Sequence, residues 1–366
     1  MALNYKQMSH PQLLRDAVIQ PSDDVHSKMA YPMIFGLPGQ IPAEGGVGEG
    51  RCIDVSAAGA LDGSILVRNE RDLFGAAAEG GGAKPIGSPR DRSDRFAEAT
   101  RAYSCKQFDG STSVKLAYIQ NSFLMSELEE EYHAKVAAAA VHLKMESFCG
   151  DFFQALAAES ATAQTTGGWL ESDWQNGLGG AALGASNSTL TTLQSALDSF
   201  YLSAHGDANA IYMPKSVLQR LQTDPQVLNR SVIGNNAAVA GSGQAVASPE
   251  HVYAVLREHM GFDEIVCAGG TQTANDASDT GANSFLWADD RIWIGRSGSV
   301  QMQVRNGVSR VISGAGAFCG VYGKLFDIDM GPEAGVGPQW FDVAVDTYFD
   351  AVSLQPNRGM IIHNMF

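Results

Sequence analysis

The longest regular pattern of apolar residues lies in the middle of the chain and predicts one long helix from about residue 123 to residue 158. Apolar residues recur there every three or four positions, at Leu128, Tyr132, Val136, Ala139, Leu143, Phe148, Phe152 and Leu156. Glutamates at 127 and 129–131 crowd its first turns, where the helix dipole favours anions. Such a helix would span roughly 50 Å, and Gly150 is the position at which it would bend or end early.

The chain before this helix reads as irregular segments between short strands. Residues 1–50 contain five prolines and end in a glycine-rich run, which predicts an extended arm. Strands are expected at 52–55 and 64–68, and a return strand at 96–108. Between them, residues 72–95 are rich in glycine, alanine and proline and predict a projecting loop.

The chain after the long helix alternates helices and strands, as an α/β or α+β domain does. A polar, glycine-rich link at 162–187 precedes a helix that Ser188 or Thr189 caps and that runs to about residue 201. Further signals predict a strand at 210–213, a helix opening at Pro214, a helix after Ser248, and a strand at 264–268. Later strands are expected at 300–305 and 317–327, with hairpins at 284–294 and at the C-terminus, where 341–349 and 360–365 flank a turn.

Composition narrows the class of protein. The 366 residues are 45% hydrophobic and 18% charged, which is ordinary for a globular protein, and no run approaches 18 apolar residues. The first residues lack the apolar stretch of a signal peptide, so we expect a soluble protein made in a cytoplasm. The net charge of −15 argues against a direct reader of nucleic acid. Five scattered cysteines without a CxxC pair predict reduced packing residues.

The candidates for chemistry each have a simpler structural interpretation. Glu130-x-x-His133 matches half of a di-iron motif, but no second half exists in the chain. His142 and Glu146 have the spacing of metal ligands, although a solvated helix face explains them better. Ser242 and Ser297 do not fit the Gly-x-Ser-x-Gly elbow, and the late aspartates alternate as on the solvent face of a sheet. We therefore expect no catalytic residue, no cofactor and no metal.

Four stretches and the order of the elements carry a resemblance to a known family. The stretches are ANAIYMPKSVLQRL at 208–221, DPQV at 224–227, WADDRIWIG at 287–295 and PNRGMII at 356–362. Together with the arm, the loop and the long helix that precede them, they resemble the HK97-fold major capsid proteins of tailed double-stranded DNA bacteriophages. The resemblance covers nearly the whole chain.

The resemblance implies an α+β, HK97-like fold with five parts: an N-terminal arm at 1–50, an extended loop region at 51–110, a peripheral domain with the spine helix at 111–160, an axial domain at 161–325, and C-terminal strands of the peripheral domain at 326–366. It implies a structural protein of the virion capsid, assembled in the host cytoplasm from pentamers and hexamers into an icosahedral shell. Such a shell encloses double-stranded DNA without sequence-specific binding. The implied partners are further copies of the chain, a scaffolding protein, a portal and a decoration protein, and no membrane is involved.

The loop region offers the candidate residues for contact with a neighbouring subunit. Its few large apolar residues, such as Leu73 and Phe74, cannot offset the entropy of ordering it alone. Arg90, Arg92 and Arg95 could bind carboxylates of a neighbour through bidentate hydrogen bonds. The alternative for this loop is a solvated hinge without contacts. Two alternatives for the protein stay open: an encapsulin-like compartment shell, and a soluble α+β enzyme with an undetected site.

Overall fold

The structure is a computed structural model, and it describes residues 29–36, 51–56, 61–68, 98–115, 126–157, 168–183, 188–204, 206–230, 246–273, 283–305, 308–314, 316–332 and 340–366. The predicted projecting loop and most of the predicted arm lie outside these residues. Inside them, strands and helices both contribute extensively, which confirms the α+β class.

The described strands form four sheets. The first has four strands in the order β1 (Cys52–Asp54), β13 (Phe318–Pro332), β14 (Trp340–Ser353) and β4 (Lys106–Lys115). The second has five, in the order β5 (Leu170–Asp173), β15 (Gly359–His363), β10 (Ile292–Gly295), β6 (Ala210–Pro214) and β7 (Glu264–Ala268). The third is β11 (Val300–Arg305), β12 (Val308–Gly314), β2 (Asp62–Arg68) and β3 (Glu98–Ser104), and β8 (Thr271–Thr273) pairs with β9 (Asn283–Phe285).

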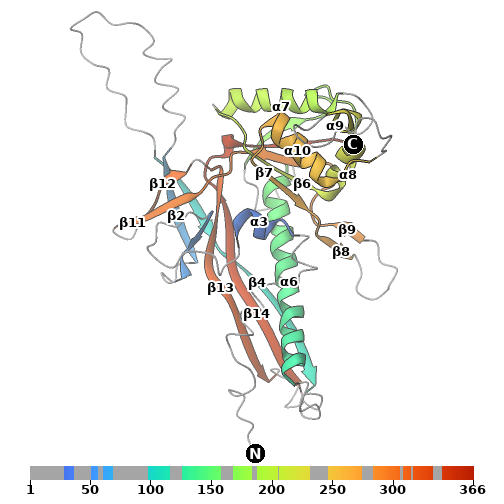
Figure 1. The fold of residues 1–366 in the computed structure, drawn as a ribbon. Helices are drawn as coiled ribbons and strands as arrows, with labels where there is room; N and C mark the ends of the chain where they lie inside the picture. Colours follow the sequence, from blue (N-terminus) through green and yellow to red (C-terminus); the bar gives the residue numbers. More distant parts are fainter. Residues whose placement is uncertain are drawn as a thin grey trace, which may run out of the picture.

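Helices cover the first two sheets. The long helix α6 (Ser126–Gln154) runs beside β4 and β14, while a group of shorter helices surrounds the five-stranded sheet at the other end of the molecule (Figure 1). The shorter helices are α7 (Thr189–Ala204), α8 (Lys215–Thr223), α9 (Pro225–Asn229) and α10 (Pro249–Met260), and two further short elements are α3 (Tyr31–Phe35) and η4 (Pro356–Arg358). The predicted long helix is thus confirmed, with 29 residues and a length of about 43 Å.

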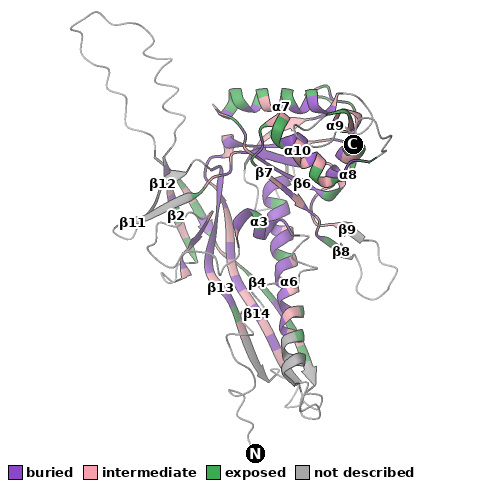
Figure 2. Cartoon of the chain, viewed as in Figure 1, coloured by how far each residue is buried: buried purple, intermediate pink, exposed green. Residues whose placement is uncertain are grey.

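The face that α6 buries differs from the one its pattern predicts. Phe148 and Phe152 are buried as expected, but Tyr132 is 62% and Val136 43% exposed (Figure 2). The helix instead packs on the sheet through small residues and a few larger ones, namely Ala134, Ala137, Ala138, Val141 and Met145. The pattern predicted the wrong face because it follows the large apolar residues. The buried face consists largely of alanines, which are only weakly hydrophobic but allow a helix to approach a sheet most closely.

Two glycines show how close this packing is. A Cβ atom added at Gly110 of β4 would lie 2.4 Å from the carbonyl oxygen of Ala137 in α6, which no side chain could accommodate. Gly150, where the sequence suggested a bend or an end, lies inside the helix and faces the ring of Trp287. An added Cβ there would lie 3.2 Å from that ring, so this glycine serves packing rather than termination.

The helices around the five-stranded sheet begin and end where local signals predict. The Ser248 side chain accepts a hydrogen bond from the His251 amide at the start of α10, and Gly261 ends that helix in the left-handed region at φ 77°. Asp224 caps α9 by accepting from the amides of Gln226 and Val227. The strands predicted at 264–268 and 300–305 match β7 and β11.

The predicted return strand at 96–108 is two strands. β3 ends at Ser104, and β4 begins at Lys106 and runs on to Lys115. Cys105 lies between them, and its amide donates to the Leu61 carbonyl.

Three expectations about connections were wrong. The strands near 284–294 do not form a hairpin, because β9 pairs with β8 while β10 lies between β15 and β6. The last two strands do not form a hairpin either, because β14 pairs with β13 and β4 whereas β15 pairs with β10 and β5. The segment taken as a polar link contains β5 and the buried side chains of Trp169 and Trp174. Alternation identifies a strand, but it does not identify the partner of that strand.

The cysteines behave as predicted. All five thiols are free, and Cys52, Cys149 and Cys319 are buried. Burial raises the pKa of the Cys319 thiol far above its ordinary value, which keeps it protonated. Within the described part of the chain, no helix is both long and apolar enough to cross a membrane.

Candidate anchoring site of the N-terminal segment

Residues 29–36, here called the N-terminal segment, pack against α6 and the sheet that contains β13 and β14. The segment forms one helical turn and a half, α3, which lies beside α6 in Figure 1. Met29, Ala30, Tyr31, Ile34 and Phe35 are all buried. The Phe35 ring contacts the rings of Phe153, Phe318 and Phe349 at centroid distances of 5.9, 5.5 and 5.3 Å. This apolar contact positions two polar clusters at the ends of the segment.

The first cluster, here called the anchor cluster, consists of Tyr31, His142 and Glu146. The Ala30 amide donates to both carboxylate oxygens of Glu146, at 3.0 and 2.9 Å, and the Tyr31 amide donates to Oε2 at 2.8 Å. The Tyr31 hydroxyl is hydrogen-bonded to Nδ1 of His142. The His142 ring is stacked on Tyr31 and also contacts the Phe326 ring, at 4.9 Å between centroids. Glu146 thus takes the place of a cap for the first amides of the segment.

The anchor cluster corrects the sequence expectation for His142 and Glu146. Both side chains are completely buried, whereas a solvated helix face was expected. The spacing placed them correctly on one face of α6, but the face is covered by a segment more than 110 residues earlier in the chain. No local pattern reports such a partner.

Burial sets the charge of the anchor cluster. Burial raises the pKa of Glu146 to about 7, against the opposing effect of the hydrogen bonds from the Tyr31 and Ala30 amides. Burial also raises the pKa of the Tyr31 phenol well above its ordinary value, and the nearby Glu146 carboxyl raises it further. The phenol therefore stays neutral, and Glu146 changes charge near neutral pH.

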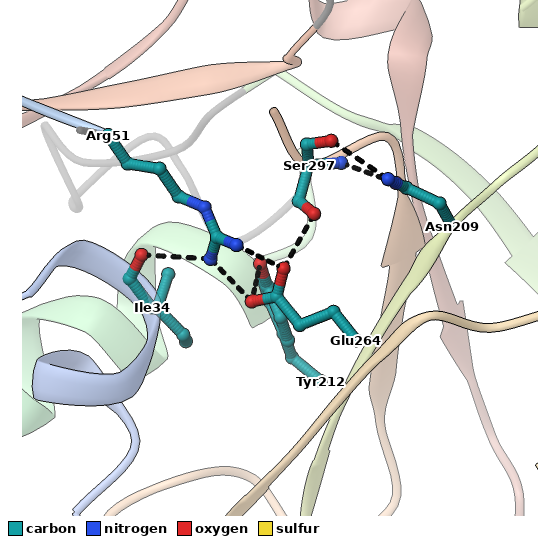
Figure 3. Close-up of polar contacts among 6 residues, drawn as sticks. All are labelled: Ile34, Arg51, Asn209, Tyr212, Glu264 and Ser297. Atoms are coloured by element: carbon teal, nitrogen blue, oxygen red, sulfur yellow. Dashed lines mark hydrogen bonds and ion pairs between the residues drawn. The ribbon is translucent and has the colours of Figure 1, made fainter. Parts of the chain in front are cut away.

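The second cluster, here called the Arg51 cluster, consists of Arg51, Asn209, Tyr212, Glu264 and Ser297 (Figure 3). The Arg51 guanidinium donates through Nη1 and Nη2 to the two oxygens of Glu264, and through Nη1 to the Ile34 carbonyl at 3.0 Å. This arginine joins the N-terminal segment to the edge strand β7 of the five-stranded sheet. Burial alone lowers the pKa of Arg51, but Tyr212 and Glu264 outweigh it and the pKa is raised, so the cation is retained.

The hydrogen bonds of Glu264 use its full capacity. The Tyr212 hydroxyl donates to Oε1 at 2.9 Å and the Ser297 hydroxyl donates to Oε2 at 2.6 Å, so each oxygen accepts two bonds. Asn209 fixes Ser297 in turn, since it accepts from the Ser297 amide at 2.7 Å and donates to the Ser297 carbonyl at 2.9 Å. A carboxylate with four donors and a serine that donates to it suit a structural clasp rather than a base and a nucleophile.

An open hollow lies beside the Arg51 cluster. It is lined by Met33, Arg51, Asn209, Arg257, Asp263, Glu264, Ile265, Val266, Ser297 and Gly298. Glu264 and Ser297 are already hydrogen-bonded to each other on this lining.

Several of the remaining sequence candidates lie outside the described residues. Arg90, Arg92, Arg95, Leu73 and Phe74 lie outside the described residues. Ser242 lies outside them as well.

His133 of the Glu130-x-x-His133 motif is hydrogen-bonded through Nδ1 to the Thr112 hydroxyl at 2.9 Å. Among the residues that the structure describes, no group of three His, Cys, Asp or Glu side chains is placed to hold a metal ion. On the outer face of β13 and β14, Asp346 and Asp327 pair with Lys324, at 2.9 and 3.3 Å.

Sequence reasoning named His142, Glu146 and Ser297 as candidates but missed the residues to which they are hydrogen-bonded. Tyr31 and Arg51 lie in or next to stretches read as an extended arm, and Glu264 lies at the start of a correctly predicted strand. Tyr212 and Ser297 lie in or next to the stretches that carried the family resemblance, and this was the one signal available.

The fold of this chain is similar to that of solved structures, although no match is found by sequence. No protein-family model matches the chain, and no curated protein matches it by sequence. Among solved structures, a phage-related protein from Bordetella bronchiseptica matches with a TM-score of 0.57 at 12% identity, over 97% of this chain and 96% of that one. A virus-like particle from Pyrococcus furiosus matches with a TM-score of 0.49 at 10% identity, over 99% and 100%. The capsid of the Myoviridae phage XM1 matches with a TM-score of 0.47 at 11% identity, over 88% and 94%.

The first of these likenesses shows a fold shared over nearly the full length of both chains. The chain therefore has the fold of that phage-related protein, and the fold is α+β as expected.

Proposed function

We propose that this chain is the major capsid protein of a tailed double-stranded DNA virus, which assembles through pentamers and hexamers into an icosahedral shell around the genome. The observation that carries the proposal is the likeness to a phage-related protein over 97% of the chain. Features of the described surface support the same role.

Two exposed apolar sites support association with further copies. Tyr132 and Val136 project from the far end of α6, and Tyr201 and Leu202, the latter 75% exposed, lie at the end of α7. The first turns of α6 and helix α7 lie at opposite ends of the molecule, so a subunit that buried both sites would contact different neighbours (Figure 2). Association that buried these four side chains would remove their apolar surface from water.

We propose that the subunit consists of five parts. Residues 1–50 act as an arm, 51–110 contain the extended loop, 111–160 form the peripheral domain with α6, 161–325 form the axial domain, and 326–366 return to the peripheral domain. β15 joins the five-stranded sheet, so the last strand ties the two domains together. A scaffolding protein, a portal and a decoration protein are the proposed partners, and DNA is enclosed without sequence-specific contacts, in keeping with the net charge of −15.

We also propose that the loop at 70–95 acts in trans on an adjacent subunit. Leu73 and Phe74 supply its apolar contacts, and Arg90, Arg92 and Arg95 bind carboxylates of the neighbour. Three arginines against two aspartates at 90–95 give this stretch a local positive charge on an acidic protein.

Electron microscopy of the purified chain, expressed with its scaffolding protein, tests the proposal. We expect closed shells or rings of five and six subunits. A deletion of residues 76–88 should leave the subunit folded by circular dichroism and abolish or weaken shell formation. A deletion of equal length, 233–245, in a later stretch that also contains glycines, serves as the matched control and should leave assembly unchanged. A compact monomer at all concentrations would contradict the capsid proposal, and normal shells from the 76–88 deletion would contradict the role of the loop.

The contents of shells from infected or lysogenic cells separate this proposal from its main alternative. Double-stranded DNA inside the shell is expected of a capsid. A protein cargo without DNA would instead favour an encapsulin-like compartment.

A further inference from the structure

A turn at residues 173–178 follows β5 and contains an asparagine that is directly followed by a glycine, Asn176 and Gly177. The side chain of Asp173, the last residue of β5, accepts hydrogen bonds from the Asn176 main-chain amide at 2.8 Å and from Asn176 Nδ2 at 3.0 Å. The main-chain carbonyl of the same aspartate accepts from the Gly177 amide at 3.0 Å and from the Leu178 amide at 2.9 Å. Asp173 therefore holds both members of the Asn176–Gly177 pair.

The turn requires a glycine at position 177. A Cβ atom added there would lie 2.8 Å from the Asp173 carbonyl oxygen, a main-chain atom that cannot move away without disrupting the turn. Since glycine has no side chain, other groups can approach its main-chain nitrogen more closely than that of any other residue. The packing of the turn thus places an unshielded nitrogen directly after the Asn176 carboxamide.

This pair of residues can modify itself. The Gly177 nitrogen can attack Cγ of Asn176, which forms an N–Cγ bond and closes a five-membered succinimide ring. The Cγ–Nδ2 bond breaks, and Nδ2 leaves as ammonia with the proton of the Gly177 amide. Water then opens the ring at one of its two carbonyls and leaves aspartate or isoaspartate. Isoaspartate routes the main chain through the side chain, so the turn could not keep its hydrogen bonds.

The hydrogen bonds to Asp173 oppose the first step of this reaction. The Gly177 amide and Nδ2 of Asn176 must both leave their acceptors before the nitrogen can bond to Cγ. The attack also places negative charge on the Asn176 carboxamide oxygen, close to the Asp173 carboxylate. The hydrogen bonds from Asn176 lower the pKa of Asp173 to about 2, so this carboxylate is ionised at neutral pH. Asn364 completes the arrangement, since its Nδ2 donates to the same carboxylate at 3.1 Å.

We propose that Asp173 suppresses deamidation of Asn176, so that Asn176 becomes a site of spontaneous modification when the turn opens. Asp173 acts as a positioning residue, because it keeps both reacting groups hydrogen-bonded to itself. This inference goes beyond the proposed function, because it concerns a covalent change within one subunit whether or not shells form.

Peptide mass spectrometry of the full-length, unassembled chain measures the reaction. The protein is incubated at mildly alkaline pH, once folded and once in urea, and the fractions of asparagine, aspartate and isoaspartate at position 176 are followed over time. The urea sample gives the rate of the pair without the turn. Asn306–Gly307, the other Asn–Gly pair in the sequence, shows in the same urea sample that the chemistry proceeds.

In the folded natural protein, Asn176 should deamidate about ten to a hundred times more slowly than in urea, because two hydrogen bonds must break, one of them to a charged group. Asp173→Ala should raise the rate in the folded protein about tenfold, through loss of the charged acceptor. Asn364→Ala is the matched control, because it removes a hydrogen bond to Asp173 but none to Asn176 or Gly177, and the rate should stay nearly unchanged.

Equal rates at Asn176 in the folded and urea samples would overturn the proposal. So would an unchanged rate in Asp173→Ala, or an equal acceleration by Asn364→Ala, which would mean that general loosening of the turn sets the rate. Should circular dichroism show that Asp173→Ala does not fold, Asp173→Asn takes its place with the same expectation, because it removes the charge and one acceptor oxygen while it keeps the shape.

Discussion

Replacing Phe153 by alanine tests whether the core is organised around this ring. Phe153 is fully buried in α6. Its ring contacts seven other aromatic rings within 6.4 Å between centroids, those of Phe35, Phe152, Trp169, Tyr212, Trp287, Trp293 and Phe318. These neighbours come from the N-terminal segment, α6, strands β6, β10 and β13, and the loops before β5 and β10, so the ring is shared by several elements of this core.

The expected cost follows from how little this site can collapse. A buried Phe→Ala substitution costs about 3–5 kcal/mol, and the cost rises with the volume of the cavity that remains. Aromatic rings anchored on separate sheets cannot close such a cavity without moving the strands that carry them. We therefore expect Phe153→Ala to lower the free energy of unfolding by about 4–5 kcal/mol, at the upper end of that range.

Denaturant titration of the unassembled subunit, followed by circular dichroism, measures this change. Tyr132→Ala is the matched control, because it truncates an aromatic ring on the same helix at a position that is 62% exposed. The control should lose less than about 1 kcal/mol. The reasoning fails if Phe153→Ala costs less than about 1 kcal/mol, or if Tyr132→Ala costs as much as Phe153→Ala, since the pattern of apolar residues would then describe the helix better than the structure does.

Two further substitutions test the polar clasp and a helix cap. Glu264→Gln should lower the free energy of unfolding by about 2–3 kcal/mol, because it leaves the half-buried Arg51 cation without its bidentate partner. The double variant Arg51→Met with Glu264→Gln should lose less than the sum of the two single losses. Strict additivity in denaturant titration would mean that the pair does not interact. Ser248→Ala should lower the free energy of unfolding by about 1 kcal/mol, because α10 loses its cap, and Ser248→Asp should retain most of that stability. Equal stability of the natural protein and both variants would show that the cap contributes nothing.

The elements that sequence predicts well are those with local signals at both ends. α10 begins with Ser248 and Pro249 and ends at Gly261, and each of these residues acts through atoms only a few positions away. β7 is a short apolar run between polar residues, and its bounds match those expected. Local hydrogen bonds and backbone preferences suffice for such elements, so their limits can be inferred from the residues themselves.

The connections and the candidate site could not be inferred in this way. β14 and β15 are neighbours in sequence, yet they lie in different sheets, because β14 pairs with β13 and β4 whereas β15 pairs with β10 and β5, all of which lie earlier in the chain. The same holds for Glu146, whose partners precede it by about 115 residues. Nothing in the residues beside a buried carboxylate distinguishes it from a solvated one when its donors are main-chain amides of a distant segment.

The two polar clusters explain how a short segment finds one position on a largely apolar surface. Met29, Ile34 and Phe35 bind through contacts that tolerate sliding or rotation, because dispersion and burial have little directionality. Hydrogen bonds do not tolerate such movement. Glu146 fixes the start of the segment through the Ala30 and Tyr31 amides, and Arg51 fixes its end through the Ile34 carbonyl. A shift by one residue would leave a buried carboxylate or guanidinium without its partners, at a cost larger than most single apolar contacts provide. The polar residues therefore specify the register, while the apolar residues supply most of the free energy of docking.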